Sequence, residues 1–332
     1  MTVVSLSLLL LAASAIGIGR NARERELPAA AAYETSAARA GTSRGEPDEA
    51  GLDGQTAEPE SENEPAGAID GEAEIRALHA AYPGIFQNVG VRDGEWAIQL
   101  NGAWYYWADG RLLPEGLREL SDQFVAIRFY NYSLGPLVVR EIAPELEERL
   151  RDRTGSITSD GDDSLRFNDF LDTLYGISSR ADAEGTVRAA SFLGMPTRVH
   201  PLLVEPLERV ERRIRASEAA SPEVTQFVED LISVHAYNWR NIAGTQRRSY
   251  HSYGVAIDLV PRSYGGRWAY WLWAAESGID EWWDLPLDER WLIPQQVIDA
   301  FEAEGFVWGG KWLFFDHLHF EYRPESIIMA QY

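Results

Sequence analysis

The stretch SYHSYGVAIDL, residues 249–259, places a histidine, a glycine and an aspartate in one short segment that ends in an apolar run. The apolar run around Ile257 is typical of a buried strand, and Gly254 before it is typical of a turn. Two interpretations follow from these residues alone. Either the segment is a turn that leads into a strand ending near Asp258, or His251 and Asp258 form half of a metal site.

A second group of polar residues lies near the C-terminus, in FDHLHFEY, residues 315–322. On a strand, residues two apart face the same way, so we expect His317, His319 and Glu321 to share one face and Asp316 to lie on the other. All of these side chains can serve one metal only if the chain bends. The residues themselves leave the choice between His317 and His319 open.

Two histidines and an aspartate suit a catalytic zinc, which takes three protein ligands and a water in tetrahedral geometry. The metal lowers the pKa of that water to roughly 7, and a nearby carboxylate can accept its proton. The chain has no cysteine, so thiolate ligands, disulfides and a cysteine nucleophile are excluded. Any zinc is therefore held by histidine and carboxylate.

These motifs resemble a known family. Residues 249–258 fit Ser-x-His-x-x-Gly-x-Ala-x-Asp, and GFVWGGKWLFFDHLHFE, residues 305–321, fits Gly-Phe-x-Trp-Gly-Gly-x-Trp followed by Asp-x-x-His-Phe-Glu. Both are similar to motifs of VanY-like zinc D-alanyl-D-alanine carboxypeptidases and, more closely, of phage-endolysin type L-alanyl-D-glutamate peptidases. The resemblance covers residues 195–323. It implies the hedgehog/D-Ala-D-Ala peptidase fold, a Zn²⁺ cofactor and peptidoglycan stem peptides as substrate.

The resemblance also implies roles for individual residues. His251, Asp258 and His319 would bind zinc, and Asp316 would be the catalytic base. Asp316 stands where the carboxypeptidase branch usually has Glu, which favours the endopeptidase-like branch. Arg240 falls where the family places an arginine that contacts the substrate carboxylate or the developing oxyanion.

Other interpretations remain open at this point. His317 occupies a position where the family usually has no histidine, so it is a competing ligand, a support of the ligands or an exposed residue. Hedgehog-type signalling domains share this fold and its zinc ligands, so a catalytically inactive zinc-containing cell-wall or peptide-binding protein is the alternative to an enzyme. In the tryptophan-rich segment 262–291, we expect Trp282 and Trp283 to line the cleft and the tryptophans at helical spacing to be core.

The charge of the chain excludes one class of partner. The formal net charge is −22, and residues 46–75 alone carry eleven Asp or Glu and no Lys or Arg. Nucleic acid is therefore not an expected partner, because phosphate binding needs a basic face. The oligomeric state is not readable from the sequence.

The N-terminal sequence predicts export. Residues 3–19 form an uncharged apolar run with a small-residue site at Ala13-Ser14-Ala15, so we expect residues 1–19 to be a signal peptide or a membrane anchor. Residues 20–72 are rich in Ala, Glu, Gly, Pro and Ser and are expected to form a disordered acidic linker. The expected location is the cell envelope or periplasm, with a membrane tether through residues 3–19 as one option.

The remaining sequence predicts an α+β fold: a small antiparallel sheet with helices packed on it, preceded by a small β-meander plus helices. Asn101-Gly102 and Asp109-Gly110 predict the turns of the meander, whose aromatic residues 104–107 are more typical of core packing than of a sugar or peptide site. Helical patterns cover 143–153, 164–176, 202–217, 222–233 and a segment from Pro294 to Gly305. We expect residues 73–190 to form a region of unknown role and residues 191–332 the zinc metallopeptidase domain.

Overall fold

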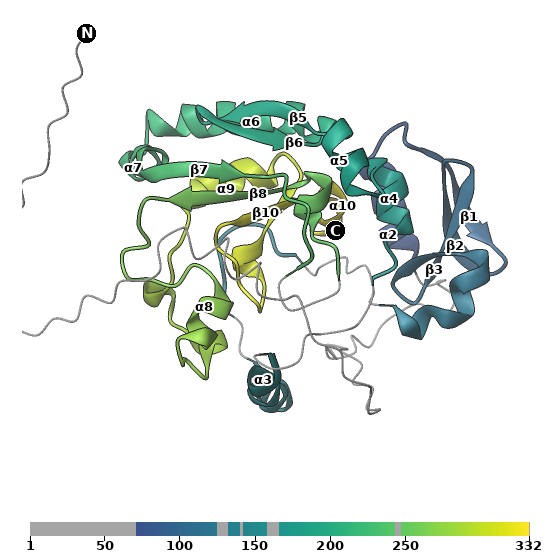
Figure 1. Ribbon diagram of the computed structural model, residues 1–332, viewed down its shortest axis with the longest axis horizontal. Coiled ribbons are helices and arrows are strands. Elements are labelled where there is room, and N and C mark those ends of the chain that lie inside the picture. The colour runs from purple at the N-terminus through teal and green to yellow at the C-terminus, as the bar shows by residue number, and fades with distance from the viewer. Residues whose placement is uncertain (1–70, 125–131, 140–141, 158–165, 243–246, 332) are drawn as a thin grey trace, which may run out of the picture.

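A computed structural model describes residues 71–124, 132–139, 142–157, 166–242 and 247–331. The chain has the expected α+β fold, with two four-stranded antiparallel sheets and a two-stranded hairpin in the described residues. Figure 1 shows the first sheet at one end of the molecule and the second sheet near its centre. The predicted signal or anchor segment and nearly all of the predicted linker lie outside the described residues.

The central sheet has the strand order β7-β8-β10-β9. Its strands are β7 (Leu231–His235), β8 (Ala256–Pro261), β9 (Phe306–Trp308) and β10 (His319–Tyr322). Strands β8 and β10 are the central pair, and their register sets His319 opposite Asp258. This pairing joins the two motifs, which lie 61 residues apart in the sequence.

Helices cover one face of the central sheet. The ring of Phe320 on β10 stacks on Phe301 of α9 (Gln295–Glu302) with 3.9 Å between ring centroids. Helix α6 (Pro201–Glu218) packs against α9 behind it. Because side chains alternate along a strand, His319 and Glu321 take the opposite face from Phe320. That second face carries the polar residues of the two motifs.

The N-terminal sheet is a meander of β1 (Phe86–Arg92), β2 (Glu95–Leu100), β3 (Ala103–Ala108) and β4 (Arg111–Pro114). The predicted turn at Asn101-Gly102 is confirmed, because both residues have positive φ angles of 53° and 82° and connect β2 to β3. Asp109-Gly110 makes the same kind of turn between β3 and β4. The central aromatic side chains of β3 are buried, as expected for core packing.

The predicted helices are present with shifted ends. They are α3 (Pro144–Ile157), α4 (Asp169–Tyr175), α6, α7 (Pro222–Asp230) and α9. Ser221 caps α7 by accepting a hydrogen bond from the Val224 amide, as its sequence position suggests. The aromatic segment after residue 267 contributes α8 (Trp271–Glu276), which Figure 1 places on the side of the central sheet away from α6.

Several short elements add to the helices and strands that the sequence predicts. They are α2 (Glu72–Ala81), α5 (Arg180–Thr186), the hairpin of β5 (Arg188–Phe192) and β6 (Met195–Val199), and α10 (Pro324–Met329). The β5–β6 hairpin spans residue 191, the predicted start of the metallopeptidase domain. Helix α2 packs on α10, and one hydrophobic cluster extends from Ile75 to Phe320. The N-terminal region and the central sheet therefore share a core.

The expectation that Trp282 and Trp283 line a cleft is wrong. Their exposed fractions are 0% and 4%, and they pack in a second cluster with Trp268, Phe315 and Leu150 of α3. Leu150 comes from a distant helix, and this contact could not be read from the local sequence. Within the described residues, no helix has both the length and the apolar character that crossing a bilayer requires.

The turn before β8 requires glycine at position 254. Gly254 has a φ of +68° and ends the short 3₁₀ helix Tyr250–Tyr253. A Cβ atom there would lie 2.9 Å from the backbone nitrogen of His200 and 3.0 Å from Val187. The glycine thus allows the close backbone approach that the sequence suggests, and it fixes the path from His251 into β8.

Replacing Gly254 by Ala should destabilise the protein for two reasons. The left-handed conformation costs about 1–2 kcal/mol for a residue with a Cβ, and the contact with His200 adds a further cost of about 1–3 kcal/mol. Gly176 is the matched control, since its φ is +64° and a Cβ atom added there would meet no atom of the described residues within 4 Å. Urea unfolding should show a larger loss for G254A than for G176A; equal losses would contradict the account.

Candidate metal centre

The structure brings His251, Asp258 and His319 together on the polar face of the central sheet. One ligand atom from each lies within 4.8 Å of the others, and all of these residues are buried. His319 Nδ1 is 2.8 Å from Asp258 Oδ1, and His251 Nε2 is 3.2 Å from Asp258 Oδ2. His251 comes from the 3₁₀ turn, Asp258 from β8 and His319 from β10.

Hydrogen bonds on the far side of each ring determine which nitrogen faces the centre. His251 Nδ1 lies 2.5 Å from the backbone carbonyl oxygen of Ala236, which leaves Nε2 facing His319. His319 Nε2 lies 3.2 Å from Glu321 Oε1, which leaves Nδ1 facing Asp258. The inward atoms are therefore His251 Nε2, His319 Nδ1 and the Asp258 carboxylate.

The charges of these groups are strongly perturbed. Burial alone would raise the pKa of Asp258, but His251 and His319 outweigh it and hold this pKa well below its usual value. Burial alone would lower the pKa of His319, but hydrogen bonds and charges from Asp258 and Glu321 raise it to about 10. Asp258 is thus an anion at neutral pH and draws positive charge towards the centre.

Asp316 lies next to the centre, in a turn that precedes β10. Its Oδ1 accepts a hydrogen bond of 3.1 Å from the Leu318 amide. Burial raises the pKa of Asp316 to about 7, with Asp258 adding to the rise and His319 and Arg240 opposing it. A carboxyl group with a pKa close to neutral pH is suited to accept and return a proton.

Arg240 follows β7 and is held through its backbone. Its amide donates to Ser252 Oγ at 3.0 Å, and its carbonyl accepts from the Ser249 amide at 3.0 Å. These bonds attach Arg240 to the turn that carries His251. Its positive charge acts on Asp316, so the structure places this predicted residue near Asp316.

The shared strand face expected for His317 and His319 is wrong, because β10 begins only at His319. His317 lies in the preceding turn, fully buried, with its ring 4.9 Å from that of Phe315 and 5.3 Å from that of Trp308. Neither ring nitrogen has a hydrogen-bond partner among the described residues. Burial, together with the charge of Arg290, lowers the pKa of His317 to about 3. It is neither exposed nor part of the metal-ligand group.

Aromatic residues border the centre. The ring of Trp312 lies 5.5 Å from the His319 ring, measured between centroids. Burial raises the pKa of Tyr264 to about 12, and the negative charges of Asp316 and Asp258 add to the rise. Tyr270 forms an isolated backbone bridge with Asp316. Trp312, Tyr264 and Tyr270 therefore lie beside the polar residues of the two motifs.

His235 has a place near the centre that the sequence did not suggest. It lies on β7 directly opposite Asp258 on β8, and it is exposed. Its Nε2 is 2.9 Å from Ser233 Oγ, the next side chain along the same strand face. In the sequence, the polar residues Ser233 and His235 alternate with the apolar Val234, upstream of Arg240. This period-two pattern is the signal that could have placed His235 on the polar face of a strand.

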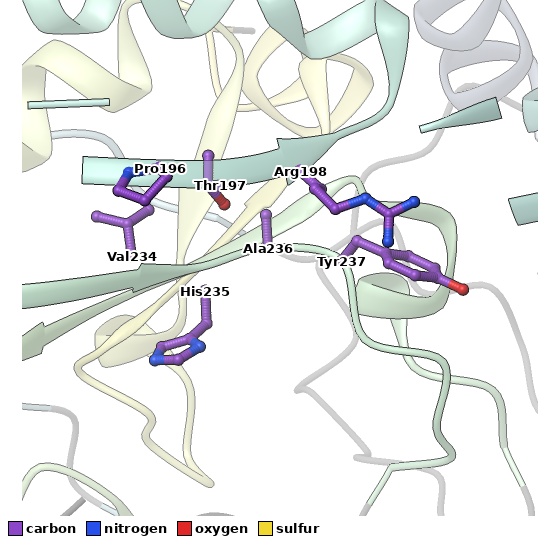
Figure 2. A pocket seen from close by; sticks show the side chains of 7 residues that line it. All are labelled: Pro196, Thr197, Arg198, Val234, His235, Ala236 and Tyr237. Atoms are coloured by element: carbon purple, nitrogen blue, oxygen red, sulfur yellow. The ribbon is translucent and has the colours of Figure 1, made fainter. Parts of the chain in front are cut away.

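A pocket of about 270 Å³ lies between β6 and the end of β7. Figure 2 shows Thr197 and Ala236 on its walls and the guanidinium group of Arg198 beside the Tyr237 ring. Ala236 also holds His251 through its carbonyl oxygen. The pocket therefore shares Ala236 with the surroundings of the candidate metal centre, and His251, Asp258, His319 and Asp316 are not among its lining residues.

Two segments of the chain are similar to known protein families. Residues 243–322 match the family model described as D-alanyl-D-alanine carboxypeptidase, so this part of the chain has the sequence features of a peptidase of that family. The match is narrower than the expected 195–323: it contains His251, Asp258, Asp316 and His319 and excludes Arg240. Residues 74–129 match a domain of unknown function (DUF8518). No solved structure matches the chain.

The residues present fit a zinc ion. Two imidazole nitrogens and one carboxylate are a donor set of catalytic zinc sites, and each imidazole here is hydrogen-bonded through its other nitrogen, as metal-bound histidines usually are. His251, Asp258 and His319 would hold the ion.

Replacing His319 by Ala should abolish stoichiometric zinc binding, because it removes one of the three donors. His317→Ala is the matched control: it lies two residues away but its ring points into an aromatic environment. Zinc content measured by mass spectrometry should fall in H319A and stay near one ion per chain in H317A. Loss of zinc in both variants would contradict the ligand assignment.

Zinc affinity should rise with pH. In the metal-free site the pKa of His319 is about 10, so Nδ1 carries a proton at neutral pH that the ion must displace. The dissociation constant should therefore be larger at pH 6 than at pH 8. Calorimetric titrations in buffers of different ionisation enthalpy should show proton release on binding; binding without proton release would argue against His319 as a ligand.

Proposed function

We propose that this protein is a zinc-dependent peptidase that hydrolyses stem-peptide bonds of peptidoglycan, as a D-Ala-D-Ala carboxypeptidase or an L-Ala-D-Glu type endopeptidase. The observation that carries the proposal is the convergence of His251, Asp258 and His319 beside Asp316, within a region that matches the D-alanyl-D-alanine carboxypeptidase family model. Zinc bound by these residues would supply a Lewis acid that activates a water and the scissile carbonyl.

The residues of the chain would divide the remaining tasks. Asp316, as a carboxylate, accepts the proton of the attacking water and returns it to the leaving amine. Arg240 provides positive charge close to Asp316, where it can neutralise a substrate carboxylate or the developing oxyanion. Trp312 and Tyr264 border this side of the site, where they would limit the access of water to a bound substrate.

The proposed substrate is consistent with the proposed location. We propose that residues 1–19 direct the chain to the cell envelope and that residues 20–70 act as an acidic spacer, which is shorter than predicted because α2 begins at Glu72. About fifty residues in a flexible regime span roughly 40 Å between their ends. A tethered domain would then reach the peptidoglycan close to a membrane surface.

Asp316→Asn should abolish turnover while zinc remains bound, because the amide cannot accept the proton. The expected loss is about 10²–10⁴-fold. Stem peptides incubated with the full chain, with products identified by mass spectrometry, would also show which bond is cut. Asp299→Asn, on the exposed side of α9, is the control and should retain activity.

Two results would count against this proposal. Full activity of D316N would rule out Asp316 as the base. Zinc binding without cleavage of any stem peptide by the unaltered chain would favour a binding protein on the same fold.

The activity should depend on the ionisation of Asp316. The base must be ionised, and its pKa is raised to about 7 in the metal-free site, so activity should be lost as the pH falls. A bound cation favours the carboxylate, so the midpoint of this loss should lie below about pH 7 in the zinc-loaded protein. The pH profile of kcat/KM measures the midpoint; constant activity down to pH 4 would contradict the assignment.

A further inference from the structure

Glu321 is a buried carboxylate for which the proposed mechanism has no role. It lies on β10 two residues after His319, so both side chains take the polar face of the sheet. Its exposed fraction is 6%, and its Oε1 is 3.2 Å from His319 Nε2. Its Oε2 is buried and makes no hydrogen bond to the described residues. Burying a carboxylate in this way costs free energy unless other charges compensate it.

The compensating charge is Arg323, which is 3% exposed. Its Nη1 lies 3.7 Å from Glu321 Oε2. The same guanidinium group donates to Tyr250 Oη at 3.2 Å and to the Glu325 carboxylate through Nε. Arg323 is therefore fixed from several sides and holds a positive charge behind Glu321.

The series of contacts continues into the N-terminal region. Glu325, also 3% exposed, accepts a hydrogen bond of 3.2 Å from the hydroxyl of Tyr82. Tyr82 follows the last residue of α2, and α2 packs on α10, which carries Glu325. Tyr82 lies in the stretch that matches a domain of unknown function, and Glu325 is 243 residues further along the chain.

We propose that Glu321 is a positioning residue for the zinc ligand His319 and that the N-terminal region supports it through Tyr82, Glu325 and Arg323. This inference rests on the proposed zinc site and adds a role for the N-terminal region. Glu321 accepts a hydrogen bond from the Nε2–H of His319, so Nδ1 faces Asp258 and, once its proton is displaced, offers its lone pair to the metal. A carboxylate in this place also makes the imidazole a stronger ligand.

Through Tyr82, Glu325 and Arg323, the N-terminal region would support the proposed zinc ligand His319. The matched peptidase segment contains none of these three residues. Glu325 and Arg323 both follow residue 322, where that match ends, and Tyr82 lies far before its start. Removing the Tyr82 hydroxyl would leave one oxygen of a buried carboxylate without its donor. The Glu325–Arg323 pair could then shift, and Glu321 with it.

The test measures zinc affinity in the full chain by competition with a chromophoric chelator. Glu321→Leu removes the acceptor and should weaken zinc binding by about 10- to 100-fold. Glu321→Gln keeps an oxygen that can accept a hydrogen bond from the Nε2–H of His319, so it should retain more affinity than E321L. The absorption spectrum of the Co²⁺-loaded protein should change in E321L, since it reports ligand geometry rather than global stability.

Tyr82→Phe tests the link to the N-terminal region, and Tyr105→Phe is its matched control. Tyr105 is a buried tyrosine of the same region whose hydroxyl donates to the Asp169 carboxylate at 2.7 Å, away from this series of contacts. Y82F should weaken zinc binding by roughly twofold to tenfold, since one hydrogen bond is lost at a distance from the ligand. Y105F should bind zinc as the unaltered chain does.

The outcomes are distinguishable. If the unaltered chain binds no zinc, the metal site fails and this inference fails with it. If the unaltered chain binds zinc and E321L binds it equally well, the positioning role of Glu321 is overturned while the metal site stands. If E321L binds zinc weakly but Y82F behaves as Y105F does, the support from the N-terminal region is overturned while the role of Glu321 stands.

Discussion

The pairing of β10 with β8 is the constraint on which the candidate metal centre depends. It sets His319 opposite Asp258 and brings their side chains to the same face of the sheet. A shift of one residue in this register would turn His319 and Glu321 to the face that α9 covers and would place Phe320 beside Asp258. The stacking of Phe320 on Phe301 opposes such a shift, because it buries the alternate side chain of the same strand.

The environment of the centre attracts positive charge. Asp258 is buried and ionised, Asp316 lies close by, and Glu321 approaches the outer side of His319. Without a metal, a proton on His319 balances part of this charge. A divalent cation would satisfy the same group of acceptors better, since it can bind the inward atoms together while Glu321 keeps its contact with the outer nitrogen. Arg240 acts on the charge of Asp316, and Arg323 acts on that of Glu321.

Local signals in the sequence predict much of this arrangement. The turns at Asn101-Gly102 and Asp109-Gly110, the cap at Ser221 and the glycine at 254 each follow from backbone chemistry that few other residues satisfy. The spacing of His251 and Asp258 within one turn and strand is likewise a local property. The α+β class follows from the same patterns.

The rest depends on contacts between distant segments. The face of His317 was predicted wrongly because the Asp316 turn delays the start of β10, and no periodicity reveals where a short strand begins. Trp282 and Trp283 are buried by partners that include Leu150. The bond between Tyr82 and Glu325 joins residues near opposite ends of the described chain. Nothing in either local sequence marks these partners.

The most direct test of the account is the position of the metal itself. Crystals of the full chain grown with zinc, with diffraction recorded on both sides of the zinc absorption edge, would locate the ion. The account predicts one anomalous peak bounded by His251 Nε2, the Asp258 carboxylate and His319 Nδ1, with Glu321 still hydrogen-bonded to His319 Nε2. A peak at other residues, or a zinc ion bound through Nε2 of His319, would contradict it.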